Sequence, residues 1–301
     1  DPRGLSEAEA TALVGEGKAV LLVTCGIHAS EIGASQMAME WAHALATAED
    51  AETKRRLSQV VLLLVPSLNP DGHRMEVDWY RRNLGTRWEG SRMPWLYHHY
   101  VGHDNNRDFA QLTQAETKAI SRVLYHDWFP QVFLDEHQMG TSGPRMFVPP
   151  YADPLDPDID PLVIREVNMI GSLMSMRLEQ AGKSGVISAW AFDVSWPGGS
   201  KNTAWWKNVT GVLTEVASVR LATPIEVPPT ELRGGGKGLV EYGPQVNFPN
   251  PWRGGAWRLR DVMDYERVAS DAIHEYCATH REDVLRNMLA KARASIAAAA
   301  P

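Results

Sequence analysis

The sequence has only two cysteines, Cys25 and Cys277, in 301 residues. Two thiols cannot build the disulfide framework of a small secreted domain, so we expect two buried free cysteines. Long apolar runs are also missing. The longest, residues 60–65, has the length of a buried strand and falls far short of the roughly 20 residues that a membrane-spanning helix needs. We therefore predict no membrane segment in this chain.

Basic residues are too few and too scattered for a nucleic-acid-binding surface. The chain has 30 lysines and arginines against 37 aspartates and glutamates, a net charge of -7. Binding to nucleic acid usually needs a basic stripe. The densest basic cluster is interleaved with Trp79, Tyr80 and Trp88, and consists of Arg81, Arg82, Arg87 and Arg92. We predict no nucleic-acid partner.

The composition is that of an ordinary globular protein, with 44% hydrophobic and 22% charged residues. No internal repeat and no domain boundary is evident, so we predict one domain over residues 1–301. The residues that follow Asp1 lack the basic and apolar regions of a signal peptide, which says little about export.

Apolar runs that predict buried strands alternate with helical segments. Strands are expected at residues 18–25, 59–68, 131–136 and 211–218, and helices at 6–15, 30–48, 113–128, 161–181 and 260–299. A turn is expected at 69–72, and long irregular segments at 78–109 and 226–255. The alternation predicts a single-domain α/β fold, with a mixed, largely parallel central sheet flanked by helices on both faces.

Metal-binding residues follow two of the predicted strands. His28 and Glu31 lie where the first strand ends and a helix begins, and His137 ends the third strand. Carboxyl ends of parallel strands meet at one sheet edge, where open α/β proteins place their sites. Two imidazoles and one carboxylate, with a fourth position left for water, are what a catalytic zinc needs. The His-x-x-Glu spacing alone is weak, because about 0.5 matches are expected by chance.

Two further features support a site. Glu215 lies inside an apolar strand, where an unpaired carboxylate costs several kcal/mol unless something such as a metal is near. The segment 103–108 gathers polar and charged side chains with nothing apolar to bury.

Seven motifs together resemble the zinc carboxypeptidase family of the carboxypeptidase A type, peptidase family M14. In order they are GIHASE at 26–31, LNPDG at 68–72, WYRRN at 79–83, GHDNNRDF at 102–109, DEHQ at 135–138, the pair Gly198-Gly199, and LTEVAS at 213–218. The likeness covers about residues 21–222 and looks closest to a bacterial subgroup of large M14-like proteins. It implies a zinc-dependent metallocarboxypeptidase that removes the C-terminal residue of a peptide, and export to the periplasm or the medium.

The resemblance also implies a role for each matching residue. His28, Glu31 and His137 match the ligands of one zinc ion per chain, and Asp104 matches the carboxylate that hydrogen-bonds the first histidine. Glu215 matches the general base and acid. The remaining matches are Arg81 as the group that stabilises the oxyanion, and Asn106 with Arg107 as the clamp on a substrate's free carboxylate.

The sequence departs from the family pattern at three places. No tyrosine precedes Gly198-Gly199, and we expect Trp196 to fill part of that space. Lys201 stands where the family sets side-chain preference, and an ammonium there would favour an acidic group on the substrate. Only 17 residues precede the first core strand, so we expect a fragment of a longer protein or a sheet without the family's first strand pair.

Other interpretations of these residues stay open. Glu31 would serve a polar strand-to-helix turn by stabilising the helix N-terminus. Glu215 would face water if its strand were an edge strand, and Arg81 and Arg107 would be structural ion-pair partners. At the level of function, the alternatives are a zinc-dependent deacylase of N-acyl amino acids and a metal- or peptide-binding domain without turnover.

Overall fold

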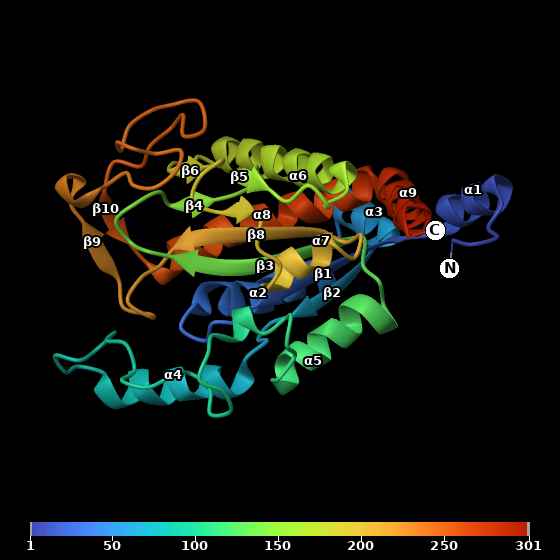
Figure 1. Cartoon of the computed structure of the whole chain (residues 1–301). Helices are drawn as coiled ribbons and strands as arrows, with labels where there is room; N and C mark the ends of the chain where they lie inside the picture. Colours follow the sequence, from blue (N-terminus) through green and yellow to red (C-terminus); the bar gives the residue numbers. More distant parts are fainter. Residues whose placement is uncertain (1, 300–301) are drawn as a thin grey trace.

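The computed structural model describes residues 2–299, and Figure 1 shows a central sheet with helices around it. The helices are α1 (Glu7–Glu16), α2 (Ile32–Ala46), α3 (Ala51–Gln59), α4 (Pro70–Asn83), α5 (Ala115–Arg122), α6 (Pro161–Gln180), α7 (Ser200–Trp205), α8 (Leu259–Thr279) and α9 (Arg281–Ala298). Short 3-10 helices are η1 (Asn105–Arg107) and η3 (Pro229–Glu231), and η2 (Val123–Asp127) is a π-helix that continues α5.

The strands belong to one large sheet and two small ones. They are β1 (Ala19–Cys25), β2 (Val60–Val65), β3 (Val132–Met139), β4 (Met146–Phe147), β5 (Ala152–Leu155), β6 (Val186–Ile187), β7 (Asp193–Val194), β8 (Thr210–Ala217), β9 (Ile225–Val227) and β10 (Gly255–Trp257). The large sheet has the order β2-β1-β3-β8-β4-β6. Its first four strands are parallel, and β4 runs antiparallel to β8. The predicted mixed, largely parallel sheet is confirmed.

Helices cover both faces of this sheet because its strands are apolar on both sides. Leu21 and Val23 of β1 belong to the main core cluster, with side chains of α2, α6 and α8. Leu22 and Phe133 point to the opposite face and pack with residues of α5 and η2 and the segments around them. Successive side chains of a strand alternate between faces, so one buried strand supplies two cores. In Figure 1, α6 and α8 lie on one side of the sheet and α5 on the other.

The predicted turn at residues 69–72 is wrong, because these residues open helix α4. The Asn69 side chain caps the helix by accepting a hydrogen bond from the Gly72 N–H at 3.0 Å, and Pro70 stands at its start. Asn and Pro suit a turn and a helix N-terminus equally well. The helix runs to Asn83, so only the remainder of the predicted irregular segment is a loop.

Helix α3 was not predicted, and it has no buried residue. Asp50 caps it, and Glu52 forms ion pairs with Arg55 and Arg56 one turn further along. Capping and ion pairs support this helix without the apolar stripe that marks a packed one. The predicted helix over 260–299 is two helices, α8 and α9, which meet at His280.

Cys25 and Cys277 are both free and buried, as expected. Within residues 2–299, no helix combines the length and the apolar character that crossing a membrane requires. Strand β2 forms one edge of the large sheet, and the expectation of a missing strand pair stays a prediction.

Candidate metal centre and active site

The parallel register of β1 and β3 places the predicted ligands at one edge of the sheet. Cys25, the last residue of β1, pairs with Glu136 on β3, so His137 is level with the loop that leaves β1. Gly26 makes that loop possible, with a φ of 65° and a site where a Cβ would lie 2.6 Å from Ser35 Oγ. His28 follows two residues later.

Glu31 starts helix α2 but does not cap it, since its side chain accepts no capping hydrogen bond. Its carboxylate instead accepts a hydrogen bond from the Gln138 N–H at 3.1 Å and faces both histidines. The helix-stabilising interpretation of Glu31 therefore does not describe its side chain.

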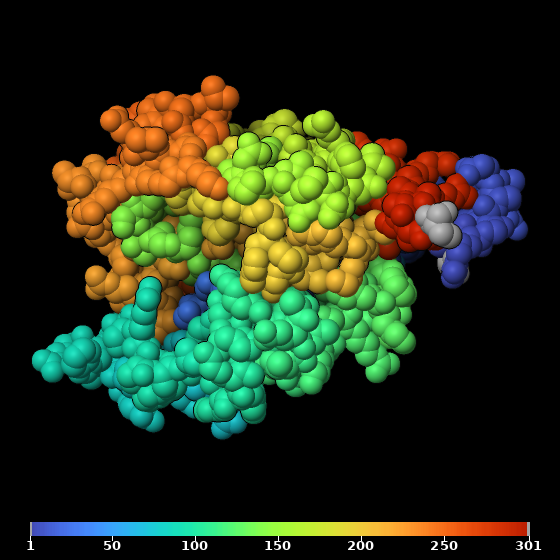
Figure 2. Space-filling view, viewed as in Figure 1, coloured from blue at the N-terminus to red at the C-terminus, as the bar shows by residue number. Residues whose placement is uncertain are grey.

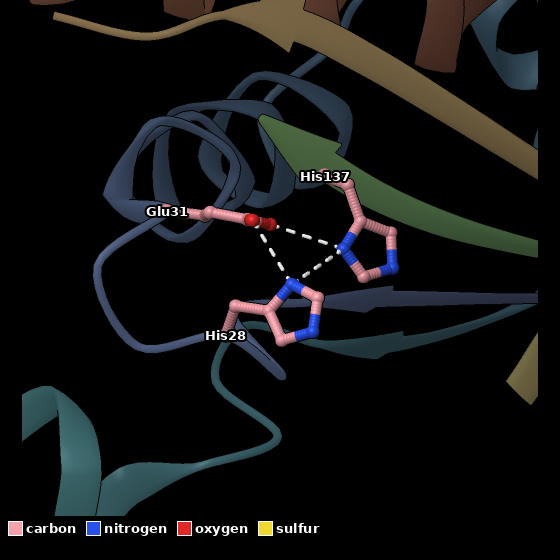
Figure 3. A group of neighbouring side chains, drawn as sticks. All are labelled: His28, Glu31 and His137. Carbon is pink, nitrogen blue, oxygen red and sulfur yellow. Dashed lines mark hydrogen bonds and ion pairs between the residues drawn. The ribbon is translucent and has the colours of Figure 1, made fainter. Parts of the chain in front are cut away.

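The three predicted ligands converge on one point (Figure 3). His28 Nδ1 lies 2.9 Å from one oxygen of Glu31, and His137 Nδ1 lies 3.0 Å from the other. The two Nδ1 atoms are 3.2 Å apart. Each ring thus presents the same nitrogen to a shared position, and the second nitrogen of each ring points away from it.

These donors fit a zinc ion. Zinc bonds of about 2.0–2.1 Å in a tetrahedral site place neighbouring ligand atoms about 3.3 Å apart. The distance between the two Nδ1 atoms, and that from each Nδ1 atom to its nearer Glu31 oxygen, are close to this value. Two imidazole nitrogens and a carboxylate are also a donor set of catalytic zinc sites. Two Nδ1 atoms in contact need a cation or a proton between them, so the arrangement suits a bound metal.

A carboxylate holds the outer nitrogen of each histidine. His28 Nε2 lies 3.0 Å from Asp104 Oδ1, as the resemblance implies. His137 Nε2 lies 2.9 Å from Asp135 Oδ2, and Asp135 also accepts hydrogen bonds from the hydroxyls of Thr24 and Ser200. Such partners fix the tautomer and orientation of a ligand histidine. Asp135 was not predicted from the sequence, although its spacing of two residues from His137 puts both side chains on one face of β3.

Charge coupling keeps the ligands ionised in the absence of metal. Burial acts to lower the pKa of His28, but Glu31 and Asp104 raise it to about 9. Burial acts to raise the pKa of Glu31, but the two histidines lower it to about 2. The pKa of His137 is raised by Asp135 and Glu31 against the effect of burial. A metal ion would therefore displace protons from the histidines on binding.

Glu215 lies beside this centre on a central strand. It is the register partner of His137, and β8 runs between β3 and β4, so the edge-strand interpretation is wrong. Burial raises the pKa of Glu215 to about 8, partly opposed by His137. A cation at the three ligands would lower this pKa, which favours the ionised form that a general base requires.

A cavity of about 350 Å³ adjoins the centre and brings together most of the predicted site residues. His28, His137 and Glu215 line it, and so do the predicted substrate-binding residues Asn106, Arg107, Trp196 and Lys201. We name it the primed cavity. Residues from five separate segments of the chain therefore line this one cavity.

Asn106, Arg107 and Trp196 form a connected group at this cavity. Asn106 Nδ2 lies 3.1 Å from His137 Nε2, and Asn106 Oδ1 accepts a hydrogen bond from the Ser200 N–H at 2.9 Å. Arg107 is exposed, and its guanidinium lies 5.1 Å from the centre of the Trp196 ring. Arg107 is also 3.8 Å from Asp104, so the ion-pair interpretation describes one of its contacts.

Lys201 is the buried cation of the primed cavity, with 6% of its surface exposed. Its ammonium lies 4.1 Å from the ring centre of Tyr151 and 4.4 Å from that of Trp205. Burial lowers the pKa of Lys201 to about 7, with Asp193 and Glu215 opposing. No carboxylate among residues 2–299 forms an ion pair with it.

Arg81 is the one predicted site residue that lines no cavity beside the three ligands. It lies in the last turn of α4 and is exposed to solvent. The ion-pair interpretation is not supported either, since Arg81 forms no ion pair with any residue that the structure describes. The role of Arg81 stays a prediction.

Comparisons with known proteins bear on the family and the fold of the chain. Residues 6–142 match the family model described as zinc carboxypeptidase, peptidase M14. The resemblance to the zinc carboxypeptidases is confirmed. Among solved structures, the metallo-carboxypeptidase from Pseudomonas aeruginosa in complex with (2-guanidinoethylmercapto)succinic acid superposes with a TM-score of 0.57 at 16% identity, over 90% of this chain and 59% of that one.

Two further carboxypeptidase-fold structures are similar. Thrombin activatable fibrinolysis inhibitor has a TM-score of 0.55 at 15% identity, over 88% of this chain and 63% of its own. The metallo-carboxypeptidase from Burkholderia cenocepacia has a TM-score of 0.52 at 14% identity, over 86% and 57%. The chain thus has the zinc carboxypeptidase fold and spans about three fifths of the length of these structures. No curated protein matches the sequence.

Proposed function

We propose that this chain is a zinc-dependent metallocarboxypeptidase that hydrolyses the C-terminal peptide bond of its substrate. The observation that carries the proposal is the convergence of His28 Nδ1, His137 Nδ1 and the Glu31 carboxylate, with Glu215 on the neighbouring strand. The family match supports the chemistry. The resemblance further implies an exported enzyme.

Different residues of this chain would carry out different parts of the reaction. When bound, zinc polarises the peptide carbonyl and lowers the pKa of a water molecule. Glu215 takes a proton from the attacking water at its carboxylate and returns it to the nitrogen of the leaving amine. Asp104 and Asp135 hold His28 and His137 in the tautomer that leaves Nδ1 free for the metal.

The primed cavity would receive the C-terminal residue. Arg107, at the cavity and exposed, is positioned to bind the free carboxylate, for which its planar guanidinium is suited. The Asn106 amide would share this role and also contacts His137. Oxyanion stabilisation is assigned to Arg81 on the resemblance alone, and it requires the arginine side chain to reach the centre from the end of α4.

The test is a set of blocked dipeptides, the matching C-terminal amides and N-acyl amino acids, assayed with zinc-loaded protein. A carboxypeptidase cleaves the peptides with a free carboxylate, and amidation abolishes cleavage because Arg107 loses its partner. A deacylase cleaves the N-acyl amino acids better than any peptide. Zinc binding without hydrolysis of any compound would refute the proposed enzyme activity. It would favour a metal- or peptide-binding domain without turnover.

Lys201 makes the substrate preference testable. We expect wild-type protein to prefer a C-terminal Glu over Leu, because a substrate carboxylate would pair with the buried ammonium. Lys201→Met should lower that preference by about 10- to 100-fold, the range for a charged hydrogen bond in a buried site. The measurement is the ratio of kcat/KM for the two peptides.

Lys207→Met is the control, because Lys207 is exposed and does not line the primed cavity. This variant should keep the wild-type ratio. A wild-type preference for Leu, or an unchanged ratio in Lys201→Met, would contradict the role of Lys201.

A further inference from the structure

A second and larger cavity, of about 670 Å³, also adjoins the candidate metal centre. His28 and Glu31 line it together with Asp104, so it shares His28 with the primed cavity. Its outer wall is the segment after α4, and residues 218–221 line it as well. Figure 2 shows the hollow between the teal and orange segments, with blue chain at its bottom. We name it the unprimed cavity.

The direction of the substrate follows from the two cavities. If the C-terminal residue occupies the primed cavity, the residues before the cleaved bond extend into the unprimed cavity. This step rests on the proposed function. The unprimed cavity is the larger of the two, so it has room for peptide side chains before the cleaved bond.

Glu76 is a buried carboxylate without a partner that lines the unprimed cavity. It lies on α4 with 5% of its surface exposed. Its side chain makes no hydrogen bond or ion pair within the described residues, and its Oε2 atom is fully buried. Burial raises the pKa of Glu76 to about 7. Leaving a buried charged group unpaired is unfavourable. A ligand that supplies the opposite charge would therefore bind more tightly by pairing with Glu76.

Other walls of the unprimed cavity suit a long cationic side chain. Met93, Trp95 and Tyr97 line the same cavity and offer apolar and aromatic surface to a methylene stem. Arg92 and Arg220 also line the cavity and would repel a cation, but both are exposed, and water and salt screen their charge. Neither arginine forms an ion pair with Glu76.

We propose that Glu76 binds the ammonium or guanidinium of a lysine- or arginine-like residue on the N-terminal side of the cleaved bond. The enzyme would then recognise two features of one peptide. A cationic side chain would bind in the unprimed cavity, and the C-terminal residue would bind in the primed cavity. Glu76 acts in this account as a specificity residue and takes no part in the hydrolysis.

The experiment compares peptides with the same C-terminal residue and either lysine or norleucine at each of the two positions before the cleaved bond. Wild-type protein should hydrolyse the lysine peptide with a kcat/KM at least about 10-fold higher at one position, as expected for a desolvated charge pair. Glu76→Gln should reduce that difference to about 2-fold or less, with the norleucine peptide unaffected.

Asp78→Asn is the matched control, because it removes the same charge from the exposed face of the same helix. It should keep the preference for lysine. Absence of a preference in wild-type protein overturns the proposal. So does an equal loss for both peptides in Glu76→Gln, which would mean that Glu76 contacts the peptide backbone.

Binding separates this proposal from the proposed function. With Glu215→Gln present to prevent turnover, calorimetry gives the Kd of both peptides with and without Glu76→Gln. A lysine preference that depends on Glu76 supports the inference even if no peptide is cleaved. Equal affinity for lysine and norleucine peptides, or no binding of either, overturns it.

Discussion

Glu215→Gln should lower kcat/KM by about 10³-fold, within the range for removal of a general base. Gln keeps the shape of the side chain but cannot accept the proton of the attacking water. The zinc content should not change, because Glu215 is not one of the three converging ligands. The measurement is peptide hydrolysis together with metal analysis of the same samples.

Glu226→Gln is the matched control for this prediction. Glu226 lies on β9 and is exposed, so the same substitution there should leave both activity and metal content at wild-type values. Unchanged activity of Glu215→Gln would exclude Glu215 as the base. Loss of activity together with loss of zinc would instead indicate that Glu215 takes part in metal binding.

Lys291→Met should lower the free energy of unfolding by about 3–5 kcal/mol, the cost of removing one partner of a buried ion pair. Lys291 on α9 is 1% exposed, and its ammonium lies 2.7 Å from Glu166 Oε2 on α6 and 3.0 Å from the Thr210 hydroxyl on β8. The pair joins two helices to the start of a central strand. Without the lysine, the Glu166 carboxylate stays buried with only neutral donors.

Urea unfolding at neutral pH measures this effect. The double variant Lys291→Met with Glu166→Leu should recover much of the loss, since it leaves no buried charge. Lys54→Met is the control, because Lys54 pairs with Glu49 on the surface and should cost about 1 kcal/mol or less. A Lys291→Met protein within 1 kcal/mol of wild type, or no recovery in the double variant, would refute the role of the pair.

The candidate metal centre was predictable from the sequence because its residues lie at or just after predicted strands. His28, Glu31 and His137 follow apolar runs that could be read as strands, and parallel strands bring their carboxyl ends together. Glu215 was found by a different signal, a carboxylate in an apolar strand. Asp135 lies within the third predicted strand, but only the pairing of β3 with β1 and the contact with Ser200 give it a role.

Other features depend on contacts between distant segments and could not be predicted. The burial of Lys201 comes from Tyr151 and Trp205, one of them far away in the sequence, so the choice between a buried and a solvated ammonium needed the fold. The division of the site into two cavities also arises from loops without periodicity. Glu76 was not predicted as a site residue, because the start of its helix was interpreted as a turn.

Metal analysis tests the central claim most directly. After purification with zinc and removal of free ion, wild-type protein should hold one zinc per chain, and His137→Ala should hold almost none while thermal unfolding shows that it is folded. His126→Ala, which removes an exposed histidine, should keep the full zinc content. A folded His137→Ala protein that still holds one zinc per chain, or wild-type protein that holds none, would contradict the three-ligand centre.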